Sequence, residues 1–418
     1  MPGLSFVIVI GGKAKVMTEA AAPMGLVEER PEGLTGLQTV LIALAGGVLV
    51  ANLYYAQPLV DLIGPSVGLG KAAEGLVVTA SQLGYAAGLI FLVPLGDFFE
   101  SRRLIATVMG ANVLALVVMV LMHGEAAFFA AIFAVGLTST AAQMLVPLAA
   151  TLTPPERRGA VVGQVMSGLI AGILFARPVA SFLAFYIGWR GVFSLSAGLV
   201  VILTLALLKV LPRNPPHARS SYGAVIGSLG RLILDEPVLR RRAFYQAMMF
   251  AGFSLFWTGA PLLLLSPVYG FTQTGVALFA LAGALGVLAA PVAGHLADRG
   301  HRHRGTIAAL SFGILAFAAA FFGDLSLAAL VAAALLIDLG SQANLVISQR
   351  EIFSLHPAIR NRLNAVFMAT FFLGGALGSA LTSPTLHWFG WHAFALLGVA
   401  FPLVALFVSL MIERRGGR

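Results

Sequence analysis

Two charged residues, Arg177 and Asp338, lie within long apolar stretches of the sequence. An apolar run of 18 or more residues is long enough to cross a bilayer as a helix. A charge inside such a helix costs roughly 2.5–3.5 kcal/mol on insertion scales, so it usually faces a cavity or a partner and marks a functional path. We therefore interpret Asp338 as a residue that binds substrate or carries a proton. Arg177 has two open interpretations: proton coupling, or pairing with a helix end.

Polar residues follow Asp338 along the same apolar stretch. Gln342 lies four residues further on, so it shares a helix face with Asp338. Ser341 and Asn344 extend this polar stripe. The alternative is hydrogen bonding between helices, which contributes only about 0.6 kcal/mol per contact on average.

A second polar group lies in the first apolar run. Asn52 and Tyr55 are three residues apart and share a face, and Gln57 and Pro58 follow directly. Proline removes a backbone donor and favours a kink. A kink exposes backbone polar groups, which membrane helices tolerate where they line a cavity.

The composition indicates what must position these residues. The 418 residues are 59% hydrophobic and 10% charged, whereas soluble proteins carry about 25% charged residues. This excludes an ordinary water-soluble domain and predicts an all-α integral membrane protein. The chain has no cysteine, which excludes disulfides and thiolate sites. Twelve helices are predicted, at 38–63, 72–97, 104–122, 126–152, 160–187, 191–212, 243–268, 273–297, 305–323, 325–347, 363–388 and 391–412.

The connections divide these helices into two groups of six. A polar, basic linker at 213–242 separates a bundle at 38–212 from a bundle at 243–412. We expect residues 1–37 to form a disordered tail and 413–418 to form a short second tail.

Basic residues are distributed unevenly between the two sides of the predicted membrane. Of the 26 Lys and Arg residues, all except Lys71, Arg177 and Arg190 fall on the side of the amino terminus. Because cytoplasmic loops carry an excess of Lys and Arg, both termini are predicted to be cytoplasmic. The net charge of +9 is then a signal of topology and of anionic lipid, and we expect no nucleic-acid partner.

The two groups of helices repeat one another. Pro155, Arg158, Met166, Gly172, Gly188 and Trp189 recur 202 residues later as Pro357, Arg360, Met368, Gly374, Gly390 and Trp391. Six helices repeated in parallel are a transporter plan, with the substrate site near the midplane between the halves. A duplicated scaffold that does not transport is the alternative.

Enzyme signatures are absent from the sequence. It has no HExxH pattern, no phosphate-binding Gly-Lys loop and no evident Ser/His/Asp cluster, so we predict that the chain is not an enzyme. His295, His301 and His303 lack a known metal-binding spacing, and no metal or cofactor is expected.

Loop motifs carry a resemblance to a known family. Segment 294–300 reads GHLADRG and is followed by Arg302 and Arg304, which is similar to the G-x-L-A-D-R-x-G-R-K/R signature of the major facilitator superfamily. A weaker copy, LGDFFESRR, occupies 95–103. The segment ANLYYAQPL at 51–59 resembles bacterial drug-efflux-like, proton-coupled members. The antiporter motif is not matched, since Ala176, Arg177 and Pro178 stand near the place of its Gly-Pro pair.

The resemblance implies a site and a gate. The superfamily fold has two pseudo-symmetric six-helix bundles, and helices 1, 4, 7 and 10 line its cavity. The implied cavity residues are Asn52, Tyr55, Gln57, Thr138, Gln143, Phe256, Trp257, Asp338 and Gln342, with Asp338 and Arg177 in proton coupling. The implied cytoplasmic gating loops contain Asp97, Arg102, Arg103, Gly294, Asp298, Arg299 and Arg302. A carboxylate beside guanidinium groups can form charge-assisted hydrogen bonds that hold helix ends together in one state; a static staple is the alternative.

These features predict an alternating-access secondary transporter of a small molecule, and proton-coupled efflux is the main hypothesis. Uptake by proton symport or uniport stays open, because no motif encodes direction. A non-transporting membrane receptor is the third alternative. We expect a monomer in the plasma (inner) membrane of a bacterium, with a small-molecule substrate, protons and the lipid bilayer as its partners.

Overall fold

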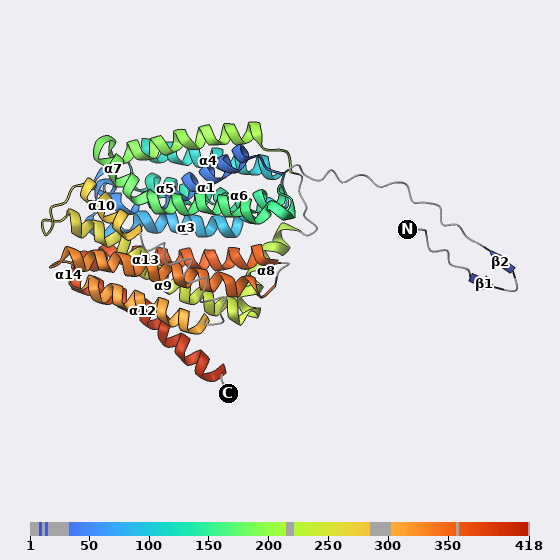
Figure 1. Cartoon of the computed structure of the whole chain (residues 1–418). Helices are drawn as coiled ribbons and strands as arrows, with labels where there is room; N and C mark the ends of the chain where they lie inside the picture. The colour runs from blue at the N-terminus through green and yellow to red at the C-terminus, as the bar shows by residue number, and fades with distance from the viewer. Residues whose placement is uncertain are drawn as a thin grey trace.

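The computed structural model describes residues 8–10, 13–15, 33–214, 221–284, 302–356 and 359–416. These residues form a helical bundle and one short pair of strands (Figure 1). The elements of the first part of the chain are β1 (Ile8–Ile10), β2 (Lys13–Lys15), α1 (Gly36–Tyr54), η1 (Gln57–Leu59), α2 (Val60–Val67), η2 (Lys71–Ala73), α3 (Leu76–Phe91), η3 (Val93–Asp97), α4 (Ser101–Leu121), α5 (Glu125–Ser139), α6 (Ala141–Thr151) and α7 (Pro155–Val210). Those of the second part are α8 (Tyr222–Asp235), α9 (Pro237–Leu265), α10 (Gln273–Ala284), α12 (Arg302–Ala320), α13 (Leu327–Phe353) and α14 (Arg360–Gly416).

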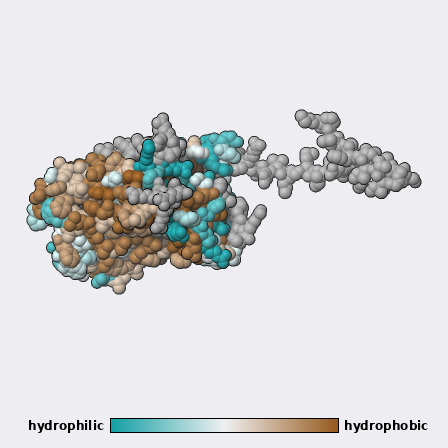
Figure 2. All heavy atoms as spheres, turned by 90° about the horizontal axis from the view of Figure 1, so that it is seen from below, coloured by the Kyte–Doolittle hydropathy of each residue, from teal (hydrophilic) through white to brown (hydrophobic). Residues whose placement is uncertain are grey.

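The helices provide hydrogen-bond partners for the backbone groups within the bilayer. A lipid interior offers no partner for N–H and C=O groups, so a chain crosses it as helices or as a closed barrel. Within the described residues, nine helices are long and apolar enough to cross a membrane, and α10 is a shorter apolar helix. The surface in Figure 2 is largely apolar, and hydrophilic residues gather toward one end. The chain is therefore a multi-pass membrane protein.

Two of these helices each contain a reversal. Gly188 in α7 has φ +67° and ψ 170°, and Gly390 in α14 has φ +77° and ψ −175°. Side-chain-bearing residues avoid this region of backbone space almost entirely. The chain turns back at each glycine, and both glycines lie at predicted connections between helices. Each of the two long helices thus supplies two predicted spans.

Replacing Gly390 with Ala is expected to cost about 1–3 kcal/mol of stability. No atom lies within 4 Å of an added Cβ, so the cost comes from backbone conformation and not from a clash. Thermal unfolding in detergent measures it. Gly198→Ala is the matched control, since Gly198 is helical and its added Cβ also meets nothing. Equal unfolding midpoints for the two variants would contradict the assignment.

The two halves lie against each other. The first half contains α1 to α7 (residues 33–214) and the second half contains α9 to α14 (residues 237–416), and they form two layers in Figure 1. Between the layers, α3 packs against α14 and α7 packs against α10. Helix α8 lies at one end of the bundle, which we name the linker end; the opposite end carries the connection between α9 and α10.

Two of the segments predicted to lie outside the helices contain secondary structure. In the tail expected to be disordered, β1 pairs antiparallel with β2; Gly11 and Gly12 separate the two strands in sequence, a pair that favours tight hairpin turns. In the predicted linker, α8 is helical, and α9 begins at Pro237 instead of residue 243. The exact number of twelve helices stays a prediction, because residues 285–301 lie outside the described part.

Candidate functional site

A chain of four polar side chains crosses the interface between the halves. From the first half, Arg177 donates a hydrogen bond from Nε to Gln57 Oε1 at 2.8 Å. From the second half, Trp257 donates from Nε1 to Asp338 Oδ2 at 3.0 Å. The Arg177 guanidinium carbon lies 4.5 Å from the centre of the Trp257 ring. Trp257 therefore contacts both membrane-embedded charges, one in each half.

Aromatic rings enclose the guanidinium group. Its carbon lies 5.1 Å from the ring centre of Tyr54 and 4.9 Å from that of Phe253, within the range of cation–π attraction. Arg177 is 5% exposed and Asp338 is 4% exposed. Among the described residues, no ion pair within 4.0 Å links these two charges. The rings and the Gln57 amide stabilise the cation in place of a directly paired carboxylate.

Local helix breaks position these side chains. Helix α1 ends at Tyr54, and Pro58 lies in the short helix η1, as the predicted kink requires. The break lies beside Gln57, which is fully buried. On the other side, Gly283 of α10 permits close packing, since an added Cβ would clash with the Trp257 ring.

Tyr54 and Phe253 were not among the residues predicted for the site. A usable signal exists for each, because Tyr54 precedes Gln57 by three residues and Phe253 precedes Trp257 by four. Residues at those spacings lie on one helix face.

Further hydrogen bonds join the halves between this site and the opposite end. Gln273 donates to Asp61 at 3.1 Å, and the Gly75 backbone N–H donates to Ser383 Oγ at 2.8 Å. Closer to the site, Gln82 donates to Ser254 Oγ at 2.9 Å. The structure is thus a state in which the halves are joined from the opposite end to the level of the site.

Two of the other predicted cavity residues lie in a polar network within the first half. Asn52 accepts from Ser196 at 2.6 Å, and its amide nitrogen donates to Asn112 at 3.3 Å. Asn112 also donates to Thr138 at 2.9 Å. Among the described residues, no hydrogen bond links Asn52 or Thr138 to Arg177 or Asp338.

The remaining predicted residues are distributed over both halves. Gln143 donates to the Tyr85 hydroxyl at 3.0 Å. The Tyr55 ring packs edge-on against Phe193, and Phe256 is fully buried beside Trp257. Gln342 is half-buried on α13. Their role as cavity residues stays a prediction.

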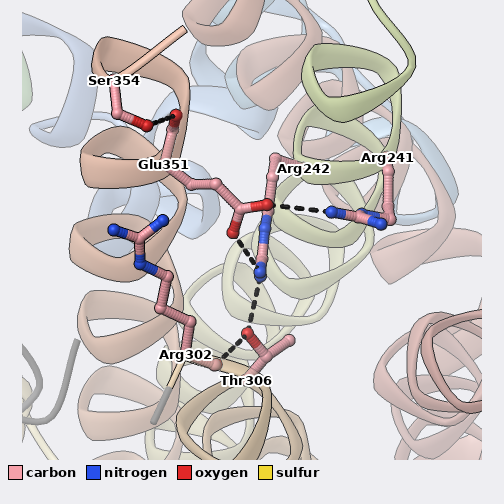
Figure 3. Close-up of polar contacts among 6 residues, drawn as sticks. All are labelled: Arg241, Arg242, Arg302, Thr306, Glu351 and Ser354. Atoms are coloured by element: carbon pink, nitrogen blue, oxygen red, sulfur yellow. Dashed lines mark hydrogen bonds and ion pairs between the residues drawn. The ribbon is translucent and has the colours of Figure 1, made fainter. Parts of the chain in front are cut away.

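A partly buried ionic cluster lies at the linker end of the second half (Figure 3). The Glu351 carboxylate of α13 pairs with Arg241 at 2.9 Å and with Arg242, both at the start of α9. Arg242 also donates to Thr306 of α12 at 2.6 Å. We name these four residues the linker-end cluster; it ties three helices together. The cluster was not predicted from the sequence, although the run of three arginines at 240–242 is a signal for it.

The predicted gating residues have different partners from those expected. Glu100 is the N-cap of α4, and it accepts from the backbone N–H groups of Arg102 and Arg103. The Arg102 guanidinium donates to the Leu211 carbonyl at 3.0 Å. Asp97 is exposed, and no described basic side chain lies within 4.0 Å of it. Gly294, Asp298 and Arg299 lie outside the described residues, so the gating role stays a prediction.

Comparison with known proteins agrees with this architecture. The profile of the Major Facilitator Superfamily matches residues 42–352. The uncharacterized transporter YgaY of Escherichia coli O157:H7 is 41% identical over 369 residues, which cover 88% of this chain and 94% of that protein. A Streptomyces coelicolor protein named probable transporter SCO4007 is 34% identical over 84% of this chain and 82% of its own length.

A solved structure shows the same fold at low sequence identity. A point mutant of the nucleoside transporter NupG superposes with a TM-score of 0.72 at 15% identity, over 90% of this chain and 98% of that chain. The match of the family profile and the identity to curated transporters show more than the fold. The chain belongs to the Major Facilitator Superfamily and is a membrane transporter of that type.

Proposed function

We propose that this chain is a proton-coupled secondary transporter, in which Asp338 takes up and releases the coupling proton. The observation that carries the proposal is the link from Asp338 through Trp257 to Arg177 of the other half. A change of charge on Asp338 therefore acts on the interface that must open and close. Substrate would bind beside Gln57 and Trp257, between the halves.

The proposed cycle follows from electrostatics. An ionised Asp338 attracts Arg177 across the interface, and a protonated Asp338 does not. Protonation thus changes the relative free energy of the state in which the halves are joined at the site. Opening from the opposite end requires breaking the Gln273–Asp61, Gly75–Ser383 and Gln82–Ser254 bonds. The linker-end cluster lies within one half and moves with it as a unit.

The basic residues support an orientation for this cycle. Arg241 and Arg242 lie at the linker end, on the side to which the sequence prediction assigns most of the other basic residues. We propose that this end faces the cytoplasm of a bacterial cell. The opposite end, where hydrogen bonds join the two halves, would then face the outside of the cell.

Two modes of coupling fit an acidic proton site. Export in exchange for protons is the mode that the resemblance to drug-efflux-like proteins favours. Co-transport of substrate and proton is the second candidate, and the position of Arg177 in the site favours it. In exchange, substrate and proton compete for Asp338; in co-transport, each promotes binding of the other.

The test is proton movement in proteoliposomes that contain a pH-sensitive dye. Drugs, dyes, sugars, nucleosides and organic acids are added in turn, with wild-type protein and Asp338→Asn compared. We expect at least one compound to move protons with the wild-type protein. The rate of proton movement should fall about tenfold or more in the variant, because an amide side chain does not take up and release a proton near neutral pH. Wild-type proton movement in Asp338→Asn would contradict the proposal.

A further inference from the structure

We infer that the co-transported substrate is a small monovalent anion with planar oxygen acceptors, such as a carboxylate, bound by the free donors of Arg177 and Gln57. This inference rests on the proposed function, and it names the substrate class of that same site. The inference goes beyond the proposed function because it selects co-transport as the mode of coupling.

Two buried donors in the site have no acceptor. They are Nη2 of Arg177 and Nε2 of Gln57, and neither has a hydrogen-bond partner among the described atoms. Gln57 Oε1 already accepts from Arg177 Nε at 2.8 Å, so the amide nitrogen is the free end of Gln57. Leaving a buried donor unpaired costs about 1–3 kcal/mol, and more for a charged group. Since both orphan atoms are donors on hydrogen-bonded neighbours, the missing partner is an acceptor.

The positive charge of Arg177 also favours an anionic ligand. Tyr54 of α1 and Gln57 of η1 face the guanidinium from the first half. Phe253 and Trp257 of α9 face it from the second half. Helix α13 contributes Asp338, and α10 contributes Gly283, which carries no charge. The titratable groups that act electrostatically on Arg177 are Asp338 and Tyr54. With a neutral Tyr54, the site carries one positive charge once Asp338 is protonated.

This charge balance couples the anion to the proton. An ionised Asp338 offsets the charge of Arg177, so an anion entering then would leave a net negative, buried site. A protonated Asp338 leaves Arg177 uncompensated, and a monovalent anion restores neutrality. Proton and anion therefore favour each other's binding, and by linkage each raises the affinity of the other by the same factor. The two would cross the membrane together.

The geometry of the donors restricts the ligand further. Arg177 Nη2 and Gln57 Nε2 offer one free donor each, and the two oxygens of a carboxylate can accept one hydrogen bond from each of them. The rings of Tyr54, Phe253 and Trp257 surround the guanidinium with apolar faces, which suit a small organic body more than further charges. One guanidinium and one proton balance one negative charge, so dianions are disfavoured.

The test is binding of acetate, lactate, benzoate and nitrate to the purified full chain, followed by tryptophan fluorescence and calorimetry. Acetamide and benzamide are the uncharged isosteres. We expect anions to bind at pH 5.5. At pH 8 their affinity should be lower by a factor of about ten or more, because loss of the Asp338 proton removes the net positive charge of the site. The amides should not bind at either pH.

Two variants test the residues directly. Asp338→Asn should bind the anion with the same affinity at both pH values, because its side chain is permanently uncharged. Arg177→Gln should weaken binding by about tenfold or more, because one charge-assisted hydrogen bond from Nη2 contributes about 1.5–3 kcal/mol. Arg190→Gln is the matched control, since Arg190 also lies over a tryptophan ring, at 4.3 Å from Trp189, but outside the site. If Arg177→Gln unfolds, Arg177→Lys keeps the charge without the planar fork and should still weaken binding.

The outcomes separate this inference from the proposed function. Proton-coupled transport of a neutral or cationic compound, with no anion binding, would overturn the inference and leave the proposed function standing. Anion binding that stays pH-dependent in Asp338→Asn would also overturn it. Anion binding without proton movement would instead contradict the proposed function.

Discussion

Replacing Glu351 with Gln is expected to destabilise the second half by roughly 3–5 kcal/mol, the usual cost of removing one partner from a buried ion pair. Glu351 is the carboxylate that Arg241 and Arg242 share, and Arg242 is 3% exposed. Without it, two adjacent guanidinium groups remain at the start of α9, one of them buried. Equilibrium unfolding in SDS-containing mixed micelles measures the loss.

Two controls separate this effect from a general loss of charge. Arg103→Gln removes an exposed pair with Glu100 at 3.8 Å, and should cost less than about 1 kcal/mol. Combining Glu351→Gln with Arg242→Gln should recover part of the loss, because no unpaired buried cation remains. A double variant as unstable as the sum of the single variants would show that the linker-end cluster is not energetically coupled.

Replacing Trp257 with Phe is expected to lower proton-driven transport about tenfold or more. The phenyl ring can still face Arg177, but Asp338 loses the indole N–H that donates to it at 3.0 Å. A hydrogen bond to a charged group contributes about 1.5–3 kcal/mol, and about 1.36 kcal/mol corresponds to a tenfold change in rate. The step in which Asp338 gives up its proton therefore becomes less favourable. Initial rates of proton-coupled flux measure the effect.

Trp391→Phe is the matched control for this substitution. Trp391 is also buried in the second half, and it donates to the Ala320 carbonyl at 2.7 Å, away from the site. Both variants should lose stability, but only Trp257→Phe should lose flux per folded molecule. Equal flux in the two variants would mean that the Trp257–Asp338 bond has no part in transport.

Much of the fold was predictable from periodic and repeated features of the sequence. The predicted helix bounds left connections at Gly188 and Gly390, which the 202-residue repeat pairs, and both glycines adopt the same unusual backbone conformation. Pro58 predicted the break that follows α1. The pair of strands in the tail was not predicted, because a few β-branched residues carry too little pattern.

The site was predictable only in part, for a physical reason. Hydropathy identifies a charge in an apolar helix, so Arg177 and Asp338 were evident from the sequence. Helical periodicity gives the face on which a residue lies, but it does not identify the helix that packs against that face. The contact of both charges with Trp257 was therefore not predictable from the sequence. A polar side chain can equally be satisfied between helices of one half, as Asn52 and Thr138 are.

The most direct test of the proposed coupling compares two modes of transport by Asp338→Asn in proteoliposomes. Exchange of labelled for unlabelled substrate at equal pH needs the halves to move but needs no net proton transfer. Accumulation driven by an imposed pH gradient needs both. If Asp338 carries the proton, the variant keeps exchange and loses accumulation. A variant that accumulates substrate as the wild-type protein does would contradict the account and place proton coupling elsewhere in the chain.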